Sequence, residues 1–502
     1  MDGNGLSLVV DHLGPIEHAH IALRPLTVFV GRNNTGKTYA AQALYAARQA
    51  LLAVPPAFVD EIEPHERSAI DELVRKRRSA GSGNGGHDDH QLPPVLLATF
   101  ARSISECLKR SGLALDLRLK ASFGVEDLRQ ISTWKSSAPL AVELRRSESK
   151  ATDFAVFGSR GTSAPIQAAL RRTEPPWPEF DSYWPFQASL FSDGDARSEE
   201  REEQLHGLMW FLVSEFWGRV SAEWGLTGTP HYLPAGRSGL LNAWTDVVKL
   251  RIQLERDRFG LPSIPEPSLD GVALDFISSL ADVLGSRPRG GVRHRRRPWG
   301  MTIREDHAGF DGAGQLLSSV MEGRITVEPQ QTQVPTLAYQ QSGQSIAIRH
   351  ASSMVADLAP LAIWVDRLLQ PDDLLIVDEP ESHLHPEAIR VVARVLVRLV
   401  NSGVRVVCAT HSSVLLHELS NAILRDAVPE LPEEDTAAGY STEDRLSVDD
   451  LAVHRFARST SDGTVHVEQL KVDPEWGIPE DEYVKVAADL SDDSARLVAR
   501  LR

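Results

Sequence analysis

The sequence contains little cysteine, no long apolar run and no excess of positive charge. Its two cysteines, Cys107 and Cys408, are too few and too distant to form a disulfide framework or a cysteine metal site. No apolar run approaches the roughly 18 residues that cross a bilayer, since even Leu358–Leu369 is interrupted by charged residues. The acidic N-terminus does not resemble a secretory signal. We therefore expect a cytoplasmic protein that has no membrane segment.

The formal net charge of −16 argues against a uniformly basic, nucleic-acid-binding surface. The charge is uneven, however, because Arg75–Arg78 and Arg287–Arg297 are basic and 426–450 is strongly acidic. Each of these charged runs is ordinarily a solvated loop. The second basic run could instead grip DNA, with Trp299 stacking on a base. The candidate DNA contacts are Arg293, Arg295, Arg296 and Arg297.

The order of the expected elements indicates an α/β fold. Apolar runs predict strands, and stretches rich in Ala, Leu and Arg predict helices. A Gly- and Ser-rich stretch at 79–94 predicts a flexible linker. The expected strands are 6–10, 16–23, 26–30, 139–146, 153–158, 231–237, 325–328, 337–349, 374–377 and 404–409, with a hairpin at 453–472; the expected helices are 38–52, 240–258, 274–284 and 352–369.

A phosphate loop occupies Gly31–Thr38, which fits the pattern G-x-x-x-x-G-K-T. It follows an apolar strand and opens a helix, so its backbone N–H groups and the helix N-terminus can surround phosphates. Lys37 would reach the β- and γ-phosphates, and the Thr38 hydroxyl would bind Mg²⁺. The residues expected to contact the nucleotide are Gly31, Asn33, Asn34, Thr35, Gly36, Lys37 and Thr38.

Two adjacent carboxylates, Asp378 and Glu379, end the apolar strand at 374–377. The carboxyl edge of a parallel sheet is where α/β proteins bind ligands. Asp378 would hold Mg²⁺, and Glu379 would polarise the attacking water. Together with the phosphate loop, this pair predicts an ATP- and Mg²⁺-dependent hydrolase.

The run Asp378–Pro386 (DEPESHLHP) resembles the Walker B motif and D-loop of ABC-type ATPases. This form is typical of AAA-family ATPases related to RecF and to the overcoming-lysogenization-defect (OLD) proteins. The resemblance is strongest over residues 1–50 and 325–425. It implies that His411, after the strand at 404–409, contacts the γ-phosphate. It also places a signature motif at Ser352 and Ser353, which would meet the nucleotide of a partner subunit.

The resemblance implies an ABC-type P-loop ATPase head with a large, mostly helical insertion. We expect the head to comprise 1–55 and 226–425, and the insertion to comprise 56–225. The remaining 426–502 would hold the acidic segment, expected as a loop, and a small C-terminal α/β element. OLD proteins carry a TOPRIM nuclease after the ATPase head, but only 91 residues follow His411 here. We expect that nuclease to be missing.

Three functions remain open at this point. The first is a sensor or motor of bacterial anti-phage defence that acts with a separately encoded effector. The second is a RecF-like DNA-repair ATPase, favoured by the arginine-rich loop. The third is an ATP-binding assembly scaffold, suggested by Met354 where a signature glycine is usual and by His385 where transporters carry Asp. All three imply a homodimer, or a higher even-numbered assembly, with ATP between two heads.

Overall fold

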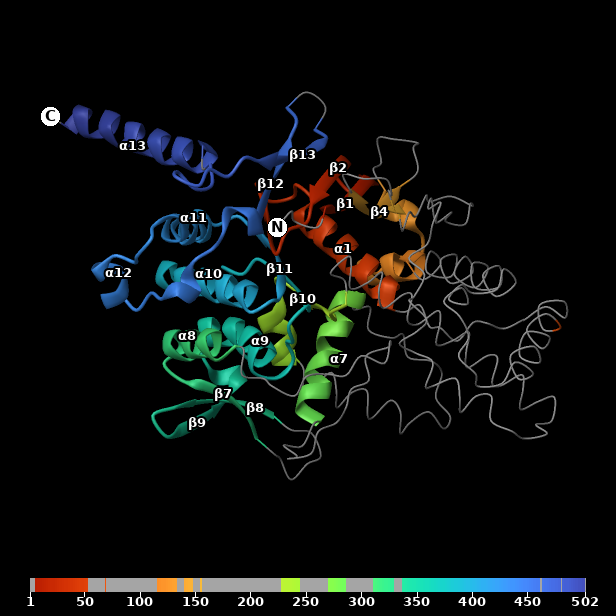
Figure 1. Ribbon diagram of the computed structural model, residues 1–502, viewed down its shortest axis with the longest axis horizontal. Helices are drawn as coiled ribbons and strands as arrows, with labels where there is room; N and C mark the ends of the chain where they lie inside the picture. The colour runs from red at the N-terminus through yellow and green to blue at the C-terminus, as the bar shows by residue number, and fades with distance from the viewer. Residues whose placement is uncertain are drawn as a thin grey trace, which may run out of the picture.

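The computed structural model describes part of the chain in detail (Figure 1). The described residues are 5–52, 68, 115–132, 140–147, 154–155, 227–243, 270–285, 310–328, 336–460, 463–479 and 481–501. The expected linker at 79–94, the basic runs at 75–78 and 287–297, and most of the expected insertion lie outside these residues.

Within the described residues, ten strands form one mixed sheet in the order β5-β4-β1-β2-β13-β12-β3-β11-β10-β6. The strand that leads into the phosphate loop, β3, lies between β11 and β12 and is parallel to both. The strand that ends in the two carboxylates, β10, is parallel to β11 and β6. The strands are β1 (Gly5–Leu13), β2 (Ile16–Ala22), β3 (Leu26–Val30), β4 (Ala141–Ser147), β5 (Phe154–Ala155), β6 (Pro230–Leu233), β10 (Leu374–Asp378), β11 (Arg405–Thr410), β12 (Leu451–Arg458) and β13 (Val465–Leu470).

Helices cover both faces of this sheet, so its central strands are buried throughout. Every residue of β3 and of β10 is buried, as their continuous apolar sequences predict. Alternate residues of β10 pack into two different cores, Ile376 on the face with α1 and Leu375 on the face with α9 and α10. The helices are α1 (Lys37–Leu52), α7 (Gly271–Gly285), α8 (Asp311–Met321), α9 (Ser353–Arg367), α10 (Pro386–Asn401), α11 (Ser413–Ala427), α12 (Glu433–Ala437) and α13 (Asp481–Leu501).

The α/β class predicted from the sequence is confirmed, but one expected strand was wrong in detail, and two segments expected outside the head pair with its strands. The expected strand at 337–349 is a hairpin of β8 (Thr336–Gln341) and β9 (Gln344–Ala347), which turns at Ser342 and Gly343 with positive φ and pairs with β7 (Arg324–Glu328). The hairpin β12–β13, expected in a separate C-terminal element, lies inside the main sheet beside β3. Strand β4, from the expected insertion, pairs with β1.

The acidic segment 426–450 is folded, although its composition predicted a solvated loop. It contains α12 and two short 3₁₀ turns, and Asp444 is 1% exposed. Two arginines one turn apart on α10 hold that carboxylate: Arg394 Nη2 and Arg398 Nη2 each lie 2.9 Å from Oδ2. These ion pairs keep the pKa of Asp444 near 2, although burial acts in the opposite direction. The segment therefore anchors the C-terminal hairpin to α10.

None of the helices in the described parts of the chain is long and apolar enough to cross a membrane.

Candidate active site

The phosphate loop has the backbone conformation that its glycines permit. Gly31 and Gly36 have φ angles of +139° and +91°, which residues other than glycine rarely adopt. A Cβ at Gly31 would lie 2.4 Å from the carbonyl oxygen of Phe456, and one at Gly36 would lie 2.8 Å from Ile16. The loop is therefore clamped between β12 and β2, and α1 begins directly after it at Lys37.

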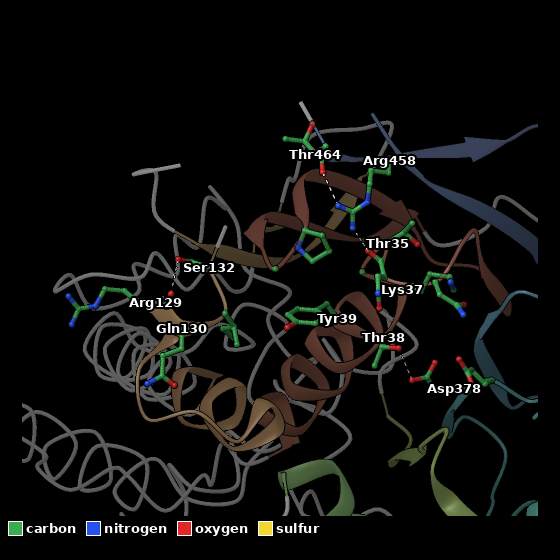
Figure 2. Close-up of a pocket in the computed structure, with 18 residues that line it drawn as sticks. Thr35, Lys37, Thr38, Tyr39, Arg129, Gln130, Ser132, Asp378, Arg458 and Thr464 are labelled. Atoms are coloured by element: carbon green, nitrogen blue, oxygen red, sulfur yellow. Dashed lines mark hydrogen bonds between the residues drawn. The ribbon is translucent and has the colours of Figure 1, made fainter. Parts of the chain in front are cut away.

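The Lys37 side chain is hydrogen-bonded to the backbone of the phosphate loop. Its Nζ donates hydrogen bonds to the carbonyl oxygens of Gly31 (2.7 Å) and Arg32 (2.8 Å), and the residue is only 8% exposed. Burial lowers the pKa of the ammonium, while the nearby charges of Asp378 and Glu379 act to raise it. Lys37 also lines the cavity over the loop, where phosphate oxygens can replace these carbonyl oxygens as its partners. In Figure 2 it points into the loop beside Thr35.

One hydrogen bond joins the phosphate loop to the Asp378–Glu379 pair. The Thr38 hydroxyl, at the start of α1, donates to Asp378 Oδ2 at 2.8 Å across 340 residues of sequence (Figure 2). The buried Tyr232 hydroxyl lies 3.4 Å from the same oxygen. Burial raises the pKa of Asp378 to about 6, and the charge of Glu379 adds to this effect. A hydroxyl and a carboxylate oxygen are hard donors that suit Mg²⁺, which commonly takes few protein ligands and completes its shell with phosphate and water.

Glu379 is held in a strained backbone conformation beside this pair. Its φ of +47° lies in the left-handed region, which a non-glycine residue occupies at a cost. Its N–H donates to the carbonyl of Ala409 at 2.9 Å, and Ser382 Oγ donates to its carboxylate at 3.1 Å. The half-buried carboxylate lines the same cavity as Lys37 and Thr38.

Arg237 explains how this strained backbone is maintained. The residue is 2% exposed, and the hydrogen bonds described for its guanidinium all end on carbonyl oxygens. One bond reaches Asp357 on α9 (3.0 Å), and others reach Asp378 (3.0 Å) and Glu379 (3.2 Å). Burial lowers the pKa of Arg237 while the surrounding acids act to raise it. Arg237 is not among the site residues predicted from the sequence, where it belongs only to the expected strand at 231–237.

Glu381 is a second residue that the sequence analysis missed. It is buried, and its Oε1 accepts hydrogen bonds from the Thr410 hydroxyl and from the His411 backbone N–H, both at 2.7 Å. The His411 Nδ1 lies 3.2 Å from the same oxygen. The imidazole itself is 45% exposed at the end of β11. Glu381 therefore fixes the position of His411, which does not line the cavity that contains Lys37. The expected role of His411 at the γ-phosphate stays a prediction.

The signature serines lie apart from the cavity. Ser352 caps the N-terminus of α9 by accepting a hydrogen bond from Val355 N at 3.3 Å, and Ser353 is the first helical residue. Both are exposed, and neither lines the cavity that contains Lys37. The buried Asp357, one turn along α9, accepts a hydrogen bond from His383 Nδ1 at 2.8 Å. This links α9 to the loop that follows Glu379.

A cavity of about 730 Å³ opens over the phosphate loop, a volume typical of sites for small ligands. One wall comes from the β12–β13 hairpin, where Arg458 donates to the carbonyl oxygens of Asn34 and Gly463. Figure 2 shows Arg458 and Thr464 above Lys37, and Arg129 and Ser132 to the left, beyond Tyr39. The remaining lining residues are Gly14, Pro15, Asn33, Asn34, Thr35, Gly36, Thr38, Gln130, Ile131, Asp378 and Glu379.

The candidate DNA contacts Arg293, Arg295, Arg296 and Arg297 fall outside the described residues. Their role stays a prediction.

Comparison with known proteins gives one family match. Residues 290–417 match the family model AAA_21, described as an AAA domain, putative AbiEii toxin, Type IV TA system. This segment contains the carboxylate strand and His411. A comparison with curated proteins finds no match.

Several solved structures of SMC head domains are similar to this chain at low identity. The SMC head domain from Thermotoga maritima is 11% identical with a TM-score of 0.32, covering 94% of this chain and 100% of that chain. An Smc head with an extended coiled coil, bound to the C-terminal domain of ScpA and derived from Pyrococcus furiosus, is 10% identical with a TM-score of 0.32, covering 97% and 98%. The family match, the strand–loop–helix unit and the Thr38–Asp378 contact together support an ABC/AAA-type P-loop ATPase.

Proposed function

We propose that this chain binds and hydrolyses ATP with Mg²⁺. The observation that carries the proposal is the hydrogen bond between Thr38 and Asp378, because it joins a phosphate loop to a paired carboxylate at the carboxyl edge of one sheet. Glu379 and Lys37 line the same cavity, so phosphate binding and water activation can occur side by side. A bound Mg²⁺ would neutralise charge on the phosphates, and Thr38 and Asp378 are the residues that would hold it.

Each of these residues has a different role in the proposed reaction. The backbone N–H groups of the phosphate loop and the Lys37 ammonium bind and orient the phosphates at the N-terminus of α1. The Glu379 carboxylate accepts a proton from the attacking water, and Arg237 keeps its backbone in the conformation that presents it to the cavity. His411, fixed by Glu381, faces the γ-phosphate.

The signature serines act in a neighbouring subunit in this proposal. Ser352 and Ser353 are exposed and do not line their own chain's cavity, so they suit a site completed by a second chain. The functional unit would then be a homodimer or a higher even-numbered assembly. Mixing Lys37→Ala chains with Ser352→Arg chains tests this: one intact composite site should restore activity in the mixture. Activity no higher than the sum of the two mutants would contradict it.

We propose anti-phage defence, with a separately encoded effector, as the biological role. The matched family model is described as a putative toxin of a Type IV TA system, which fits a defence component better than a repair enzyme. The RecF-like reading depends on the arginine-rich loop at 287–297, and the scaffold reading depends on Met354 and His385.

The decisive measurement is steady-state ATP hydrolysis with and without duplex DNA, with Glu379→Gln as the blank. The proposal predicts Mg²⁺-dependent ATP turnover above that of the blank. Duplex DNA should leave this turnover unchanged, or stimulate it only when the separately encoded effector is present. Several-fold stimulation by DNA alone would favour the repair role. Turnover equal to the blank would leave the scaffold as the explanation.

A further inference from the structure

The C-terminal helix α13 carries apolar side chains that no described part of the chain covers. It extends away from the sheet in Figure 1, and every residue from 488 to 498 is exposed. Four of its large apolar side chains are more than half exposed: Val486 (60%), Leu490 (63%), Leu497 (63%) and Val498 (51%). An exposed apolar face of this kind marks an interaction surface.

The apolar residues form a stripe with two different edges. At about 100° per residue, Val486, Leu490 and Leu497 lie within about 40° of one another around the helix axis. The edge on one side of the stripe is charged and contains Asp489, Asp493, Arg496 and Arg500, all of them exposed. The opposite edge is uncharged and contains Ser491, Ser494 and Val498. The two edges therefore distinguish between possible arrangements of a partner helix.

The charged edge has a polarity along the helix. Its acids, Asp489 and Asp493, come first, and its arginines, Arg496 and Arg500, come last. When two copies of one helix pack antiparallel along their stripes, each edge faces the same edge of the other copy, with its order reversed. In a parallel pair, each edge faces the opposite edge. Only the antiparallel arrangement places the acids of this edge opposite its arginines.

We propose that α13 binds the α13 of a second copy of this chain in an antiparallel pair, independently of nucleotide. The apolar stripes pack against each other in this pair, with the charged edges side by side. The helix carries five acidic residues (Asp481, Glu482, Asp489, Asp492, Asp493) against three basic ones (Lys485, Arg496, Arg500), so it does not suit an anionic membrane surface. The contact is distinct from the ATP-dependent interface, and it does not rest on ATP hydrolysis.

Sedimentation velocity of the full-length protein without nucleotide tests the contact. A Lys37→Ala background excludes association through bound ATP. We expect concentration-dependent dimers, and the change Leu490→Glu with Leu497→Glu should weaken the association at least about tenfold, because four charges would enter the apolar seam. The matched control is Ala488→Glu with Ala495→Glu, which places the same charges on the opposite face of the helix and should leave association unchanged.

Charge exchange tests the orientation. One variant, Arg496→Glu with Arg500→Glu, makes all four of these edge positions acidic, and a second, Asp489→Arg with Asp493→Arg, makes all four basic. Each alone should associate more weakly than the wild type, and an equimolar mixture should form mixed dimers. A wild-type chain that stays monomeric at about 100 µM without nucleotide would overturn the proposal and leave the stripe to a different protein. Mixed variants that associate no better than either alone would overturn the antiparallel arrangement.

Discussion

Asp378 should destabilise the nucleotide-free protein, and Asp378→Asn should make it more stable. Burial raises the pKa of this carboxyl from 3.8 to about 6, so ionising it costs more in the folded chain than in the unfolded one. A difference of about two pKa units corresponds to roughly 3 kcal/mol, and the residue is only 4% exposed. The Asn side chain removes the charge and can still accept the Thr38 hydrogen bond through Oδ1.

The sign of the pH dependence follows from the raised pKa. Between about pH 4 and pH 6 the folded carboxyl is protonated while the unfolded one is ionised, so the wild-type protein loses stability as the pH rises through this window. Above about pH 6 the full cost of roughly 3 kcal/mol is present, and below about pH 4 it is absent.

Thermal unfolding of the two proteins without nucleotide or Mg²⁺ measures this difference. At pH 7.5 the apparent Tm of Asp378→Asn should exceed that of the wild type by about 3 °C, and at pH 4.5 most of the difference should disappear. Glu387→Gln, an exposed carboxylate on α10, is the control and should change Tm little at either pH. A wild-type protein as stable as Asp378→Asn at pH 7.5 would refute the reasoning, as would a difference independent of pH.

Substitutions at three buried residues test how the site and the acidic segment are supported. Arg237→Met removes the donors to three backbone carbonyl oxygens. ATP turnover should therefore fall on the order of 100-fold, and the melting temperature should drop. Turnover equal to that of the wild type would contradict the role assigned to Arg237. Glu381→Ala should lower kcat about tenfold or more with little change in KM, because His411 loses its anchor, whereas Glu381→Gln, which retains an acceptor, should lose less. Asp444→Asn should cost roughly 2 kcal/mol of unfolding free energy at pH 7, measured by urea denaturation. This difference should shrink as the pH falls from about 4 to about 2, because the pKa of Asp444 lies near 2.

The parts of the site that the sequence predicts are contiguous in the chain. The phosphate loop and the Asp378–Glu379 pair each consist of a strand followed directly by polar residues, and local pattern is enough to identify both. The contact between Thr38 and Asp378 confirms that they lie together. The roles of Ser352 and His411 stay predictions, since each depends on a bound nucleotide or a second chain.

The supporting residues escaped sequence reasoning because their partners are distant. Arg237 bonds to carbonyl oxygens at 357, 378 and 379, and carbonyl oxygens leave no trace in the amino-acid sequence. Arg458 reaches the carbonyl of Asn34 across 424 residues. Asp444 lies in a run of acids that composition alone predicts to be solvated, and only the fold brings Arg394 and Arg398 against it. Glu381 could have been suspected, because it follows the carboxylate pair in the DEPE run.

The position of β3 in the sheet has a consequence for how the protein is made. Both neighbours of β3 come from late in the chain: β11 is at 405–410 and β12 is at 451–458. A ribosome therefore releases the phosphate-loop strand more than 350 residues before its first partner strand. Until then the strand is an unpaired apolar edge, which is a hazard for aggregation. The nascent chain cannot bind nucleotide in its final geometry until β11 and β12 have both been synthesised.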